Sequence, residues 1–555
     1  MRIRGASTPL KATITKLLTI VNPAYAEALK KRRPTWGMDS HLQLFIYDQG
    51  DLITPRGFLN DLKQVLVKHG IDPWKVIFYT QTEGRPADFG PWNSEYTLRP
   101  YQLPYVAAIV DDSGVGVAPA GSGKTIMGCR AIYEIGRPTL WLTHTTDLMY
   151  QTKTRAEATL QGVGRIGLLG DAVQDWGSGK LIIATVQTLQ VNPQLIEILD
   201  DLIGLIVVDE AHHFPAAQFI ETVGKFSAAR VIGLTATPDR KDRLEFYMYA
   251  GIGPLLHTID RDNLYDGGSL LKPEVKFVYT AFDYEQASLR EGTNVDAGGE
   301  DLDYHALLQA VINDPARAVL IANTIMDYTA RGTSLVLTES VRYLFYLRDC
   351  VIARAKLRGV KIPRMAVVHG GLQRYTWQVA KSEKAANDLI VAGQAIERKY
   401  DEKARRWKVK VAPYTEVEME AWKVTGKQRK DLIEAVRNRE YDILFATQLA
   451  REGLDIDHLT VEHMAMSKKG DAQDRKDGSS VEQELGRIQR PDRSNPGKAP
   501  ILIDYVDYNV GVFQEQYYSR RKVYKRLGLT VPGKAKSPKD AERDLIDTLL
   551  GSFPF

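Results

Sequence analysis

The sequence predicts an α/β protein with two tandem doubly wound parallel-sheet lobes, a small N-terminal α/β domain and an insertion in the second lobe. Short apolar runs alternate with helical periodicity twice along the chain, from about 94 to 260 and from about 274 to 530. A glycine-rich turn after the first of these runs joins a strand to a helix, as parallel-sheet folds require. The predicted strands are 114–118, 139–143, 180–184, 205–208 and 230–234 in the first set, and 334–338, 365–368, 443–446 and 501–505 in the second.

Length and composition limit the class of protein. At 555 residues, the chain is long enough for roughly three to four domains. Apolar residues make up 44% and charged residues 26%, as in soluble globular proteins. No run approaches the roughly 18 apolar residues that a membrane span needs. We predict an N-terminal domain at 1–92, a first lobe at 93–262, a second lobe at 263–530 with an insertion at 373–424, and a tail at 531–555.

Charge and cysteine content narrow the choice of partners. The net charge of +4 is too small for a polycation, so any nucleic-acid surface must come from local basic patches. The two cysteines, Cys129 and Cys350, belong to no CxxC or Cys/His cluster, which argues against a zinc site and fits a reduced compartment. We expect Cys129 to lie in the core, because it falls on a predicted helix at 126–135.

The N-terminal domain has weaker patterns than the rest of the chain. Residues 42–47 alternate like a strand, 58–69 carry apolar residues at helical spacing, and 76–79 read as another strand. Residues 86–93, with two prolines and a glycine, predict a linker to the first lobe.

Residues 118–125 read Ala-Pro-Ala-Gly-Ser-Gly-Lys-Thr, a pattern that cradles nucleotide phosphates. The glycines let the backbone turn so that its N–H groups converge on phosphate oxygens, and Lys124 adds a charge for the terminal phosphates. The Thr125 hydroxyl can bind Mg²⁺. The full signature begins with Gly, whereas this chain has Ala118. The loop residues predicted to bind nucleotide are Gly121, Ser122, Gly123, Lys124 and Thr125.

Two carboxylates follow the apolar run at 205–208. A buried parallel strand delivers such groups to its carboxyl edge, where the phosphate loop also lies. Asp209 can hold the metal ion, and Glu210 can orient and deprotonate the attacking water. Together with the phosphate loop, these residues predict ATP hydrolysis.

Arg487 and Arg490 lie three residues apart, and we place them on one face of a helix. Arginine is permanently charged and donates through a planar fork. The pair is therefore expected to reach across a cleft toward the γ-phosphate and to take part in catalysis.

The order of these segments resembles that of superfamily 2 helicases of the DEAD/DEAH-box type, over residues 94–530. The matching segments are 98–102 (Q motif), 118–125 (motif I), 142–148 (Ia), 184–188 (Ib), 209–212 (II), 235–238 (III), 446–455 (V) and 483–490 (VI). In this superfamily motif I often begins with Ala, and Glu484 stands where relatives often have a basic residue. Segments 18–23, 54–57, 503–507 and 517–527 are similar to phage and prophage helicases of the UvsW type, which are XPB-like.

The resemblance implies two RecA-like lobes that share ATP and Mg²⁺, and it implies further site residues. Nucleotide contacts are expected from Arg99, Gln102, Gly453 and Asp455, and interlobe coupling from His212, Thr235, Thr237 and Gln483. Nucleic-acid contacts are expected from Thr185, Gln187, His369, Thr447 and Gln448. The alternative for Thr185 and Thr447 is strand-end capping, and the alternative for His212 is metal binding.

Residues 398–410 of the insertion hold seven basic residues against two acidic ones. Trp407, Val409 and Val411 alternate with two lysines, which predicts a basic β-hairpin turning near 401–402. Arg405, Arg406 and Trp407 are expected to contact DNA, as a strand-separating pin or a duplex grip. The alternative is a solvated insertion without a DNA role.

These observations predict a monomeric, Mg²⁺- and ATP-dependent DNA helicase or translocase that acts in recombination, repair or replication. Its partner is forked, branched or single-stranded DNA, read with little sequence preference through phosphate contacts. The resemblance places it in the cytoplasm of a bacterium or of a phage-infected host, without a membrane partner. The alternatives are an RNA-stimulated helicase and an ATP-gated DNA-clamping subunit of a restriction or defence system.

Overall fold

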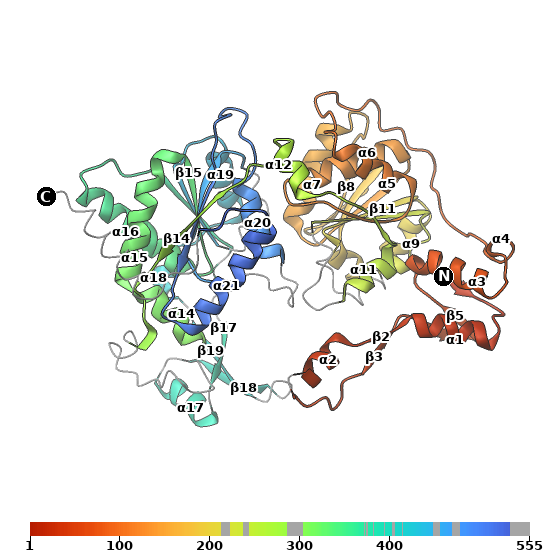
Figure 1. The fold of residues 1–555 in the computed structure, drawn as a ribbon, viewed down its shortest axis with the longest axis horizontal. Helices are drawn as coiled ribbons and strands as arrows, with labels where there is room; N and C mark the ends of the chain where they lie inside the picture. The colour runs from red at the N-terminus through yellow and green to blue at the C-terminus, as the bar shows by residue number, and fades with distance from the viewer. Residues whose placement is uncertain are drawn as a thin grey trace. The chain divides into compact units, whose positions relative to one another are not determined.

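The computed structural model describes most of the chain, and Figure 1 shows its helices and strands. The described residues are 1–30, 32–211, 222–236, 244–285, 304–370, 372, 376–380, 382–392, 395–401, 406–412, 414–447, 456–468 and 478–532. Their packing defines two compact units, one of residues 1–286, 457–460 and 467–555, the other of 287–456 and 461–466. No helix in the described part of the chain has the length and apolar character needed to cross a bilayer.

The N-terminal region is a small α/β domain around one core. Its elements are β1 (Arg2–Ile3), α1 (Thr8–Leu17), β2 (Thr19–Val21), α2 (Pro23–Lys30), β3 (His41–Gln43), β4 (Ile46–Asp48), β5 (Asp51–Ile53), η1 (Arg56–Phe58), α3 (Leu59–Lys68) and α4 (Pro73–Val76). Strands β1, β5 and β4 form an antiparallel sheet, and β2 pairs with β3. Apolar residues of α1 and α3, among them Ile14 and Leu62, build the core.

Two of the three N-terminal predictions need correction. The helix predicted at 58–69 is confirmed as α3. The strand predicted at 42–47 is divided into β3 and β4. The strand predicted at 76–79 is wrong, because Asp72 caps a short helix whose first residue is Pro73, and Phe78 beyond it is exposed.

An eight-stranded sheet carries the phosphate loop. Its strands lie in the order β13-β6-β12-β11-β7-β10-β8-β9, and all neighbours are parallel except β8 and β9. The elements are α5 (Gln102–Asp111), β6 (Gly114–Val117), α6 (Lys124–Ile135), β7 (Thr139–Thr143), α7 (Thr146–Thr159), β8 (Gly167–Gly170), β9 (Val173–Asp175), β10 (Leu181–Thr185), α8 (Val186–Val191), α9 (Gln194–Asp200), β11 (Leu205–Asp209), β12 (Arg230–Thr235), α11 (Glu245–Ile252), β13 (Leu255–Thr258) and α12 (Arg261–Asp266).

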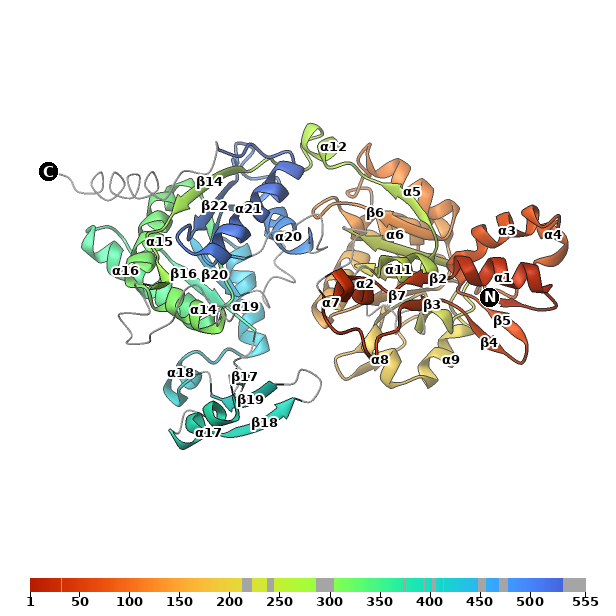
Figure 2. The ribbon, with the colours of Figure 1, turned by 60° about the horizontal axis from the view of Figure 1, so that its bottom comes forward.

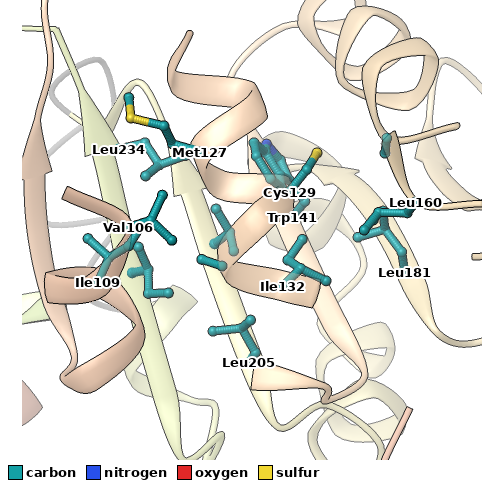
Figure 3. Close-up of a cluster of buried hydrophobic side chains, with 14 of the residues drawn as sticks. Val106, Ile109, Met127, Cys129, Ile132, Trp141, Leu160, Leu181, Leu205 and Leu234 are labelled. Atoms are coloured by element: carbon teal, nitrogen blue, oxygen red, sulfur yellow. The ribbon is translucent and has the colours of Figure 1, made fainter. Parts of the chain in front are cut away.

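Helices cover both faces of this sheet, as predicted. Leu205 and Val207 of β11 pack with α5 and α6 in one buried cluster, which Figure 3 shows. Ile206 and Val208 point the other way and pack with α9 and α11. A strand buried on both faces needs consecutive apolar residues, which is why β11 reads as a continuous apolar run. Cys129 lies in the first cluster, so its predicted core position is confirmed.

A second sheet has six strands in the order β14-β22-β21-β15-β20-β16. The pairs β14–β22, β15–β20 and β16–β20 are parallel. The elements are β14 (Glu274–Tyr279), α14 (Tyr304–Asn313), α15 (Pro315–Tyr328), η3 (Thr329–Arg331), β15 (Thr333–Thr338), α16 (Val341–Leu357), β16 (Met365–Val368), α19 (Gly426–Arg437), β20 (Ile443–Thr447), β21 (Leu459–Met464), α20 (Gly478–Ile488), β22 (Ile501–Val506) and α21 (Gly511–Arg526).

All nine strands predicted for the two lobes are confirmed to within one residue at each end. The prediction missed β8, β9, β13 and β14, and it also missed β21, whose six residues are all buried. Thr460, Glu462 and His463 interrupt the apolar pattern of this strand, so periodicity alone does not reveal it.

The insertion folds around its own small sheet. Its elements are β17 (Thr376–Ala380), α17 (Glu383–Val391), β18 (Glu397–Asp401), β19 (Arg406–Val411) and α18 (Glu416–Ala421). The predicted hairpin is confirmed, since β18 and β19 pair antiparallel with Asp401 opposite Arg406. The prediction missed β17, which pairs with the other edge of β19, and α17, which packs against this sheet (Figure 2).

Candidate nucleotide site and its surroundings

The phosphate loop connects β6 to α6. Gly121 and Gly123 have φ angles of 82° and 87°, values in the left-handed region that glycine adopts without strain. A side chain at Gly121 would meet Leu270, because its Cβ would lie 2.7 Å from Leu270 Cδ2. Lys124 and Thr125 begin α6, so the loop ends at a helix N-terminus, where backbone N–H groups favour anions.

Residues of the Q motif form hydrogen bonds with the phosphate loop. Gln102 is buried, and its Nε2 donates to the Ser122 carbonyl at 2.8 Å. Its Oε1 accepts from the Arg99 backbone N–H at 2.9 Å, and the Tyr101 hydroxyl donates to the same Ser122 carbonyl at 3.1 Å. Gln102 therefore braces the phosphate loop in this structure, which was not part of its predicted role.

The two predicted acids lie next to the loop. Asp209 ends β11 and is buried, and Lys124 Nζ lies 3.4 Å from Glu210 Oε1. Glu210 has a φ angle of 46°, a left-handed conformation that costs a non-glycine residue roughly 1–2 kcal/mol. Such strain persists where the surrounding structure enforces it, often at functional sites. Here it accompanies a carboxylate placed beside the loop lysine.

The electrostatics of Asp209 fit a bound cation. Burial and the neighbouring Glu210 carboxylate raise the pKa of Asp209 to about 6, against the opposing effect of Lys124. Two carboxylates held together in a buried place favour binding of positive charge. Asp209 and the Thr125 hydroxyl at the start of α6 are oxygen donors of the kind that Mg²⁺ takes. The residues present therefore fit the predicted Mg²⁺ site.

Thr235 connects the neighbouring strand to the loop. It is the last residue of β12 and fully buried, and its carbonyl accepts from the Ala118 N–H at 2.9 Å. The start of the phosphate loop and motif III thus share a backbone hydrogen bond. This bond is a direct physical link between two of the predicted motifs.

Helix α20 carries the motif VI residues and lies against the phosphate loop. A Cβ added at Gly486 would stand 3.0 Å from the Ala120 Cβ. Arg487 follows on α20 and is largely buried. The prediction that Arg490 shares a helical face with Arg487 is wrong, because α20 ends at Ile488. Pro491 explains this, since the residue before a proline is disfavoured in a helix.

The unusual Glu484 has a partner of opposite charge. Its side chain is almost completely buried and forms an ion pair with Lys468. Lys468 lies in the segment after β21 and is the last described residue before 478. The Glu484 carboxylate is thus paired with a cation from another part of the chain.

A buried network that the sequence did not predict connects α12 to α20. Arg261 forms an ion pair with Glu482 and donates through Nη1 to Gln489 Oε1 at 3.0 Å. Gln489 in turn donates to the Tyr265 hydroxyl at 2.9 Å, and its carbonyl accepts from the Leu271 N–H. Glu482 and Gln489 lie seven residues apart, two helical turns along the sequence of α20 and its end. No single-residue pattern in the sequence signals this network.

A second missed network fixes the C-terminal helix. Arg520 of α21 donates to both Asp504 oxygens at 2.8 Å, and the Tyr524 hydroxyl donates to Asp504 Oδ2 at 2.8 Å. Both Asp504 and Arg520 are fully buried. A usable signal existed here, because an aspartate inside the apolar strand 501–506 requires a buried cation or donor.

Two predicted nucleic-acid contacts lie at the end of β10. Thr185 is the residue before α8, but its side chain makes no capping bond. Its Oγ1 lies 2.8 Å from Thr188 Oγ1, so simple capping does not describe it. Gln187 is exposed, and its amide donates to the His144 carbonyl at 3.2 Å.

His369 and Thr447 lie in the second unit and are both buried. The His369 ring nitrogens lie 2.9 Å and 3.0 Å from the carbonyls of Gly370 and Trp422. The structure thus places His369 among its own unit's backbone. Thr447 ends β20, and within the described part of the chain its hydroxyl has no hydrogen-bond partner.

Trp407 lies inside the insertion. It packs beside the buried cluster that contains Ala386 of α17 and Val409. The Arg398 guanidinium lies 4.8 Å from the centre of its ring, and the Tyr400 ring lies at 5.3 Å. Trp407 thus packs within the insertion, and its DNA contact stays a prediction.

Several predicted residues cannot be placed. His212, Thr237, Arg405, Gln448, Gly453 and Asp455 lie outside the described residues, as do the side chains of Arg406 and Gln483. Their roles remain predictions.

Two family models match separate parts of the chain. "Type III restriction enzyme, res subunit" matches residues 95–240, and "Helicase conserved C-terminal domain" matches residues 383–492. The first range holds the phosphate loop, Asp209 and Thr235, and the second holds α20 with Arg487.

Individual relatives agree with these matches. A "DNA 3'-5' translocase XPB2" of Sulfurisphaera tokodaii is 25% identical over 366 residues, 66% of this chain and 73% of that protein. A "DNA 3'-5' helicase XPB" of Kineococcus radiotolerans is 33% identical over 206 residues, 35% of each chain. The chain spans only 25% to 39% of the length of the relatives that are at least 30% identical. "The crystal structure of T4 UvsW" aligns over 94% of both chains with 12% identity and a TM-score of 0.34, too low to support a closer relationship.

Proposed function

We propose that this chain, a superfamily 2 helicase, couples ATP hydrolysis to movement along DNA. The observation that supports this most is the arrangement around Lys124: Glu210 lies 3.4 Å from its ammonium, Asp209 adjoins, and Gly486 of α20 packs on Ala120 of the loop. Phosphate binding, water activation and a helix with a buried arginine meet at one edge of the sheet.

Each residue has a separate role in the proposed reaction. Lys124 and the loop N–H groups bind the β- and γ-phosphates. Thr125 and Asp209 would hold Mg²⁺, which would neutralise charge on the phosphates. Glu210 orients the attacking water and accepts its proton, while Arg487 stabilises the charge that develops on the γ-phosphate. Arg490 assists from the segment after α20. Arg99 and Gln102 orient the nucleotide.

Movement follows from loss of the γ-phosphate. With ATP bound, Arg487 attracts the phosphates and the two lobes close, and after hydrolysis this attraction disappears and the lobes separate. If each lobe holds the phosphates of one strand, each cycle shifts that strand. The proposed grips are Thr185, Gln187, His369, Thr447 and Gln448, with Gly453, Asp455, His212, Thr235, Thr237 and Gln483 coupling or binding nucleotide.

The proposed substrate is forked, branched or single-stranded DNA, in recombination, repair or replication. It is supported by the names of the relatives, which describe DNA helicases and translocases. The insertion at 373–424 and the N-terminal domain at 1–92 would add DNA contacts outside the lobes at 93–262 and 263–530. The protein is expected to act as a monomer.

An ATPase and unwinding panel tests this proposal. Single-stranded DNA, forked and Holliday-type DNA, blunt duplex and RNA are compared as activators of the full-length protein. The proposal requires DNA to stimulate hydrolysis and a fork or junction to be unwound. Lys124→Ala should abolish turnover, and Glu210→Gln should bind ATP without hydrolysing it. Full turnover in either variant would refute the site, and stimulation by RNA alone would favour the RNA helicase.

A second function is favoured by one specific match. The model that matches residues 95–240 is described as a subunit of a restriction enzyme. Such a chain could clamp DNA under ATP control without unwinding it. ATP-dependent DNA retention, together with absent strand displacement and absent translocation, would select this alternative.

A further inference from the structure

An arm projects from the N-terminal domain between residues 19 and 43. Strands β2 and β3 form its stem, with Val21 opposite His41, and α2 and a loop form its tip. Asn22 closes the base, because its N–H donates to the Ser40 carbonyl and its Nδ2 donates to the Asp39 carbonyl. In Figure 1 the stem leaves α1 and β5 as a narrow ribbon. These hydrogen bonds join the two chain segments where the stem meets the tip.

The tip has almost no core of its own. Ala28 is the one buried residue of α2, and the N-terminal core contains no residue of the arm. Folding therefore gains little apolar burial from the tip. A tip that adds so little to stability is more simply explained by contact with another molecule.

A tight turn presents Trp36 to solvent. The Met38 N–H donates to the Thr35 carbonyl at 3.1 Å, and Gly37 between them has a φ angle of 76°. This matches a turn that places glycine at its third position because a left-handed angle is needed there. Trp36 precedes that glycine and is 96% exposed. No other large hydrophobic side chain in the described part of the chain is as exposed.

Basic residues lie on the same tip. Lys30 ends α2, and Arg32 and Arg33 close it, their N–H groups donating to the Leu29 and Ala28 carbonyls. All three side chains are exposed, and within the described residues no carboxylate forms an ion pair with them. In contrast, Arg2 and Arg4 of the same domain pair with Asp48 and Asp51.

The domain as a whole is the basic part of the chain. Residues 1–92 hold thirteen Lys and Arg against eight Asp and Glu, a net charge of +5, whereas the entire chain carries +4. The rest of the protein is thus close to neutral. The positive charge is concentrated where the arm is.

We propose that the tip of this arm binds single-stranded nucleic acid, with Trp36 stacked on an unpaired base and Lys30, Arg32 and Arg33 on the flanking phosphates. This rests on the proposed action on DNA and adds a contact outside the two lobes. Aromatic side chains beside basic residues are the recurring means of binding single strands without sequence preference. A blunt duplex offers the phosphates but no free base within the helix.

Binding of the full-length protein to labelled DNA tests the proposal. A fork with two single-stranded arms is compared with a blunt duplex of equal length, without nucleotide. Trp36→Ala should weaken fork binding about five- to hundredfold, since one stacked base accounts for a difference of this size, and should change duplex binding less than twofold. Trp36→Phe should retain binding. Trp74→Ala is the matched control, because Trp74 is 81% exposed on α4, outside the arm.

The phosphate contacts have a separate readout. Arg32→Gln combined with Arg33→Gln should reduce the slope of log affinity against log salt by about 1.4, at roughly 0.7 for each single-strand phosphate. An unchanged slope, or a Trp36→Ala variant that binds the fork like Trp74→Ala, overturns the proposal.

ATP hydrolysis separates this proposal from the proposed function. Basal hydrolysis should be the same in all variants, because the arm is remote in sequence from the phosphate loop and its side chains are exposed. If DNA stimulates the wild type and the arm variants bind normally, the arm proposal fails and the motor stands. If no DNA binds or stimulates the wild type, both fail.

Discussion

In both large sheets, polar residues lie at or just after the ends of neighbouring strands. The two sheets differ in the partners that these polar residues have. In the eight-stranded sheet, the neighbouring strands β6, β12 and β11 end at the phosphate loop, Thr235 and Asp209. In the six-stranded sheet, β15 and β16 flank β20. Strands β15 and β20 end at Thr338 and Thr447, and His369 directly follows β16.

The difference lies in what satisfies these groups. Thr338 donates within its own unit, toward Ser340 and Met466, and His369 after β16 contacts two backbone carbonyls. Asp209 instead remains beside a second carboxylate with a raised pKa. Lys124 and the Glu210 N–H offset the charge of Asp209 only in part, since its pKa is still raised. We therefore expect first-sheet residues to govern activity and most second-sheet residues to govern stability.

The largest expected effect follows Asp209→Asn. Loss of the metal-binding charge should reduce ATP hydrolysis at least about a hundredfold. The same change should stabilise the nucleotide-free protein at pH 8, because a raised folded-state pKa means that ionised Asp209 disfavours folding. A rise from 3.8 to about 6 corresponds to at most about 3 kcal/mol. Calorimetry should therefore show a higher Tm by a few degrees.

The pH dependence of this increase in Tm tests whether the charge of Asp209 causes it. As the pH falls from about 6 to below 4, the wild-type carboxyl protonates in the folded state and the difference in Tm should disappear. Asp201→Asn, at an exposed carboxylate, should show no gain. A gain that persists at pH 3.5 would rule out the electrostatic origin.

His369→Gln should lower the stability of the protein, whereas Asp209→Asn should raise it. Loss of one carbonyl contact and of the ring packing on Phe345 should destabilise the protein by about 2 kcal/mol and lower its Tm. Thr447→Val should leave the Tm within about a degree and weaken single-strand binding. Reversal of these two outcomes would show that the sheets do not differ as described.

Arg261→Gln tests the role of α12, the helix that follows the last strand of the eight-stranded sheet. Without its ion pair to Glu482, α20 should be less well held near the phosphate loop. We expect kcat for ATP to fall about tenfold with KM within about twofold, as for a positioning residue. Arg526→Gln is the control, because Arg526 approaches the same carboxylate at 3.5 Å but is half exposed. Equal effects of the two variants would reject this role.

The two cysteines give the smallest effect. Burial raises the pKa of Cys129 to about 12. Burial also raises the pKa of Cys350, which lies on α16 and is partly exposed. Under native conditions an alkylating reagent should modify Cys350 slowly and Cys129 not at all, as read by mass spectrometry. Labelling of Cys129 first would mean that the first sheet opens more readily than the second unit.

The sequence was informative where one segment contains the whole signal. The strand 205–208 is buried on both faces and therefore apolar throughout, and the glycines of the phosphate loop are required by local backbone angles. In contrast, β21 has buried polar residues whose partners come from elsewhere in the fold. Local pattern could not reveal it.

The site shows the same limit. Lys124, Asp209 and Glu210 could be predicted because their spacing relative to strands fixes their place. Arg261 with Glu482, and Lys468 with Glu484, are pairs between distant segments, and each residue alone looks like an ordinary surface charge. The Trp407 side chain packs beside the buried cluster that includes Ala386 of α17. The charge pattern of the hairpin did not indicate this helix.

Single-turnover ATP hydrolysis by Arg487→Ala tests the central claim most directly, with ATP binding measured on the same protein. Arg493→Ala, at an exposed arginine six residues further along the chain, is the control. If α20 supplies a catalytic charge to the nucleotide, the rate should fall at least about a hundredfold with ATP affinity little changed, and the control should match the wild type. An Arg487→Ala protein that hydrolyses ATP at the wild-type rate would contradict the account.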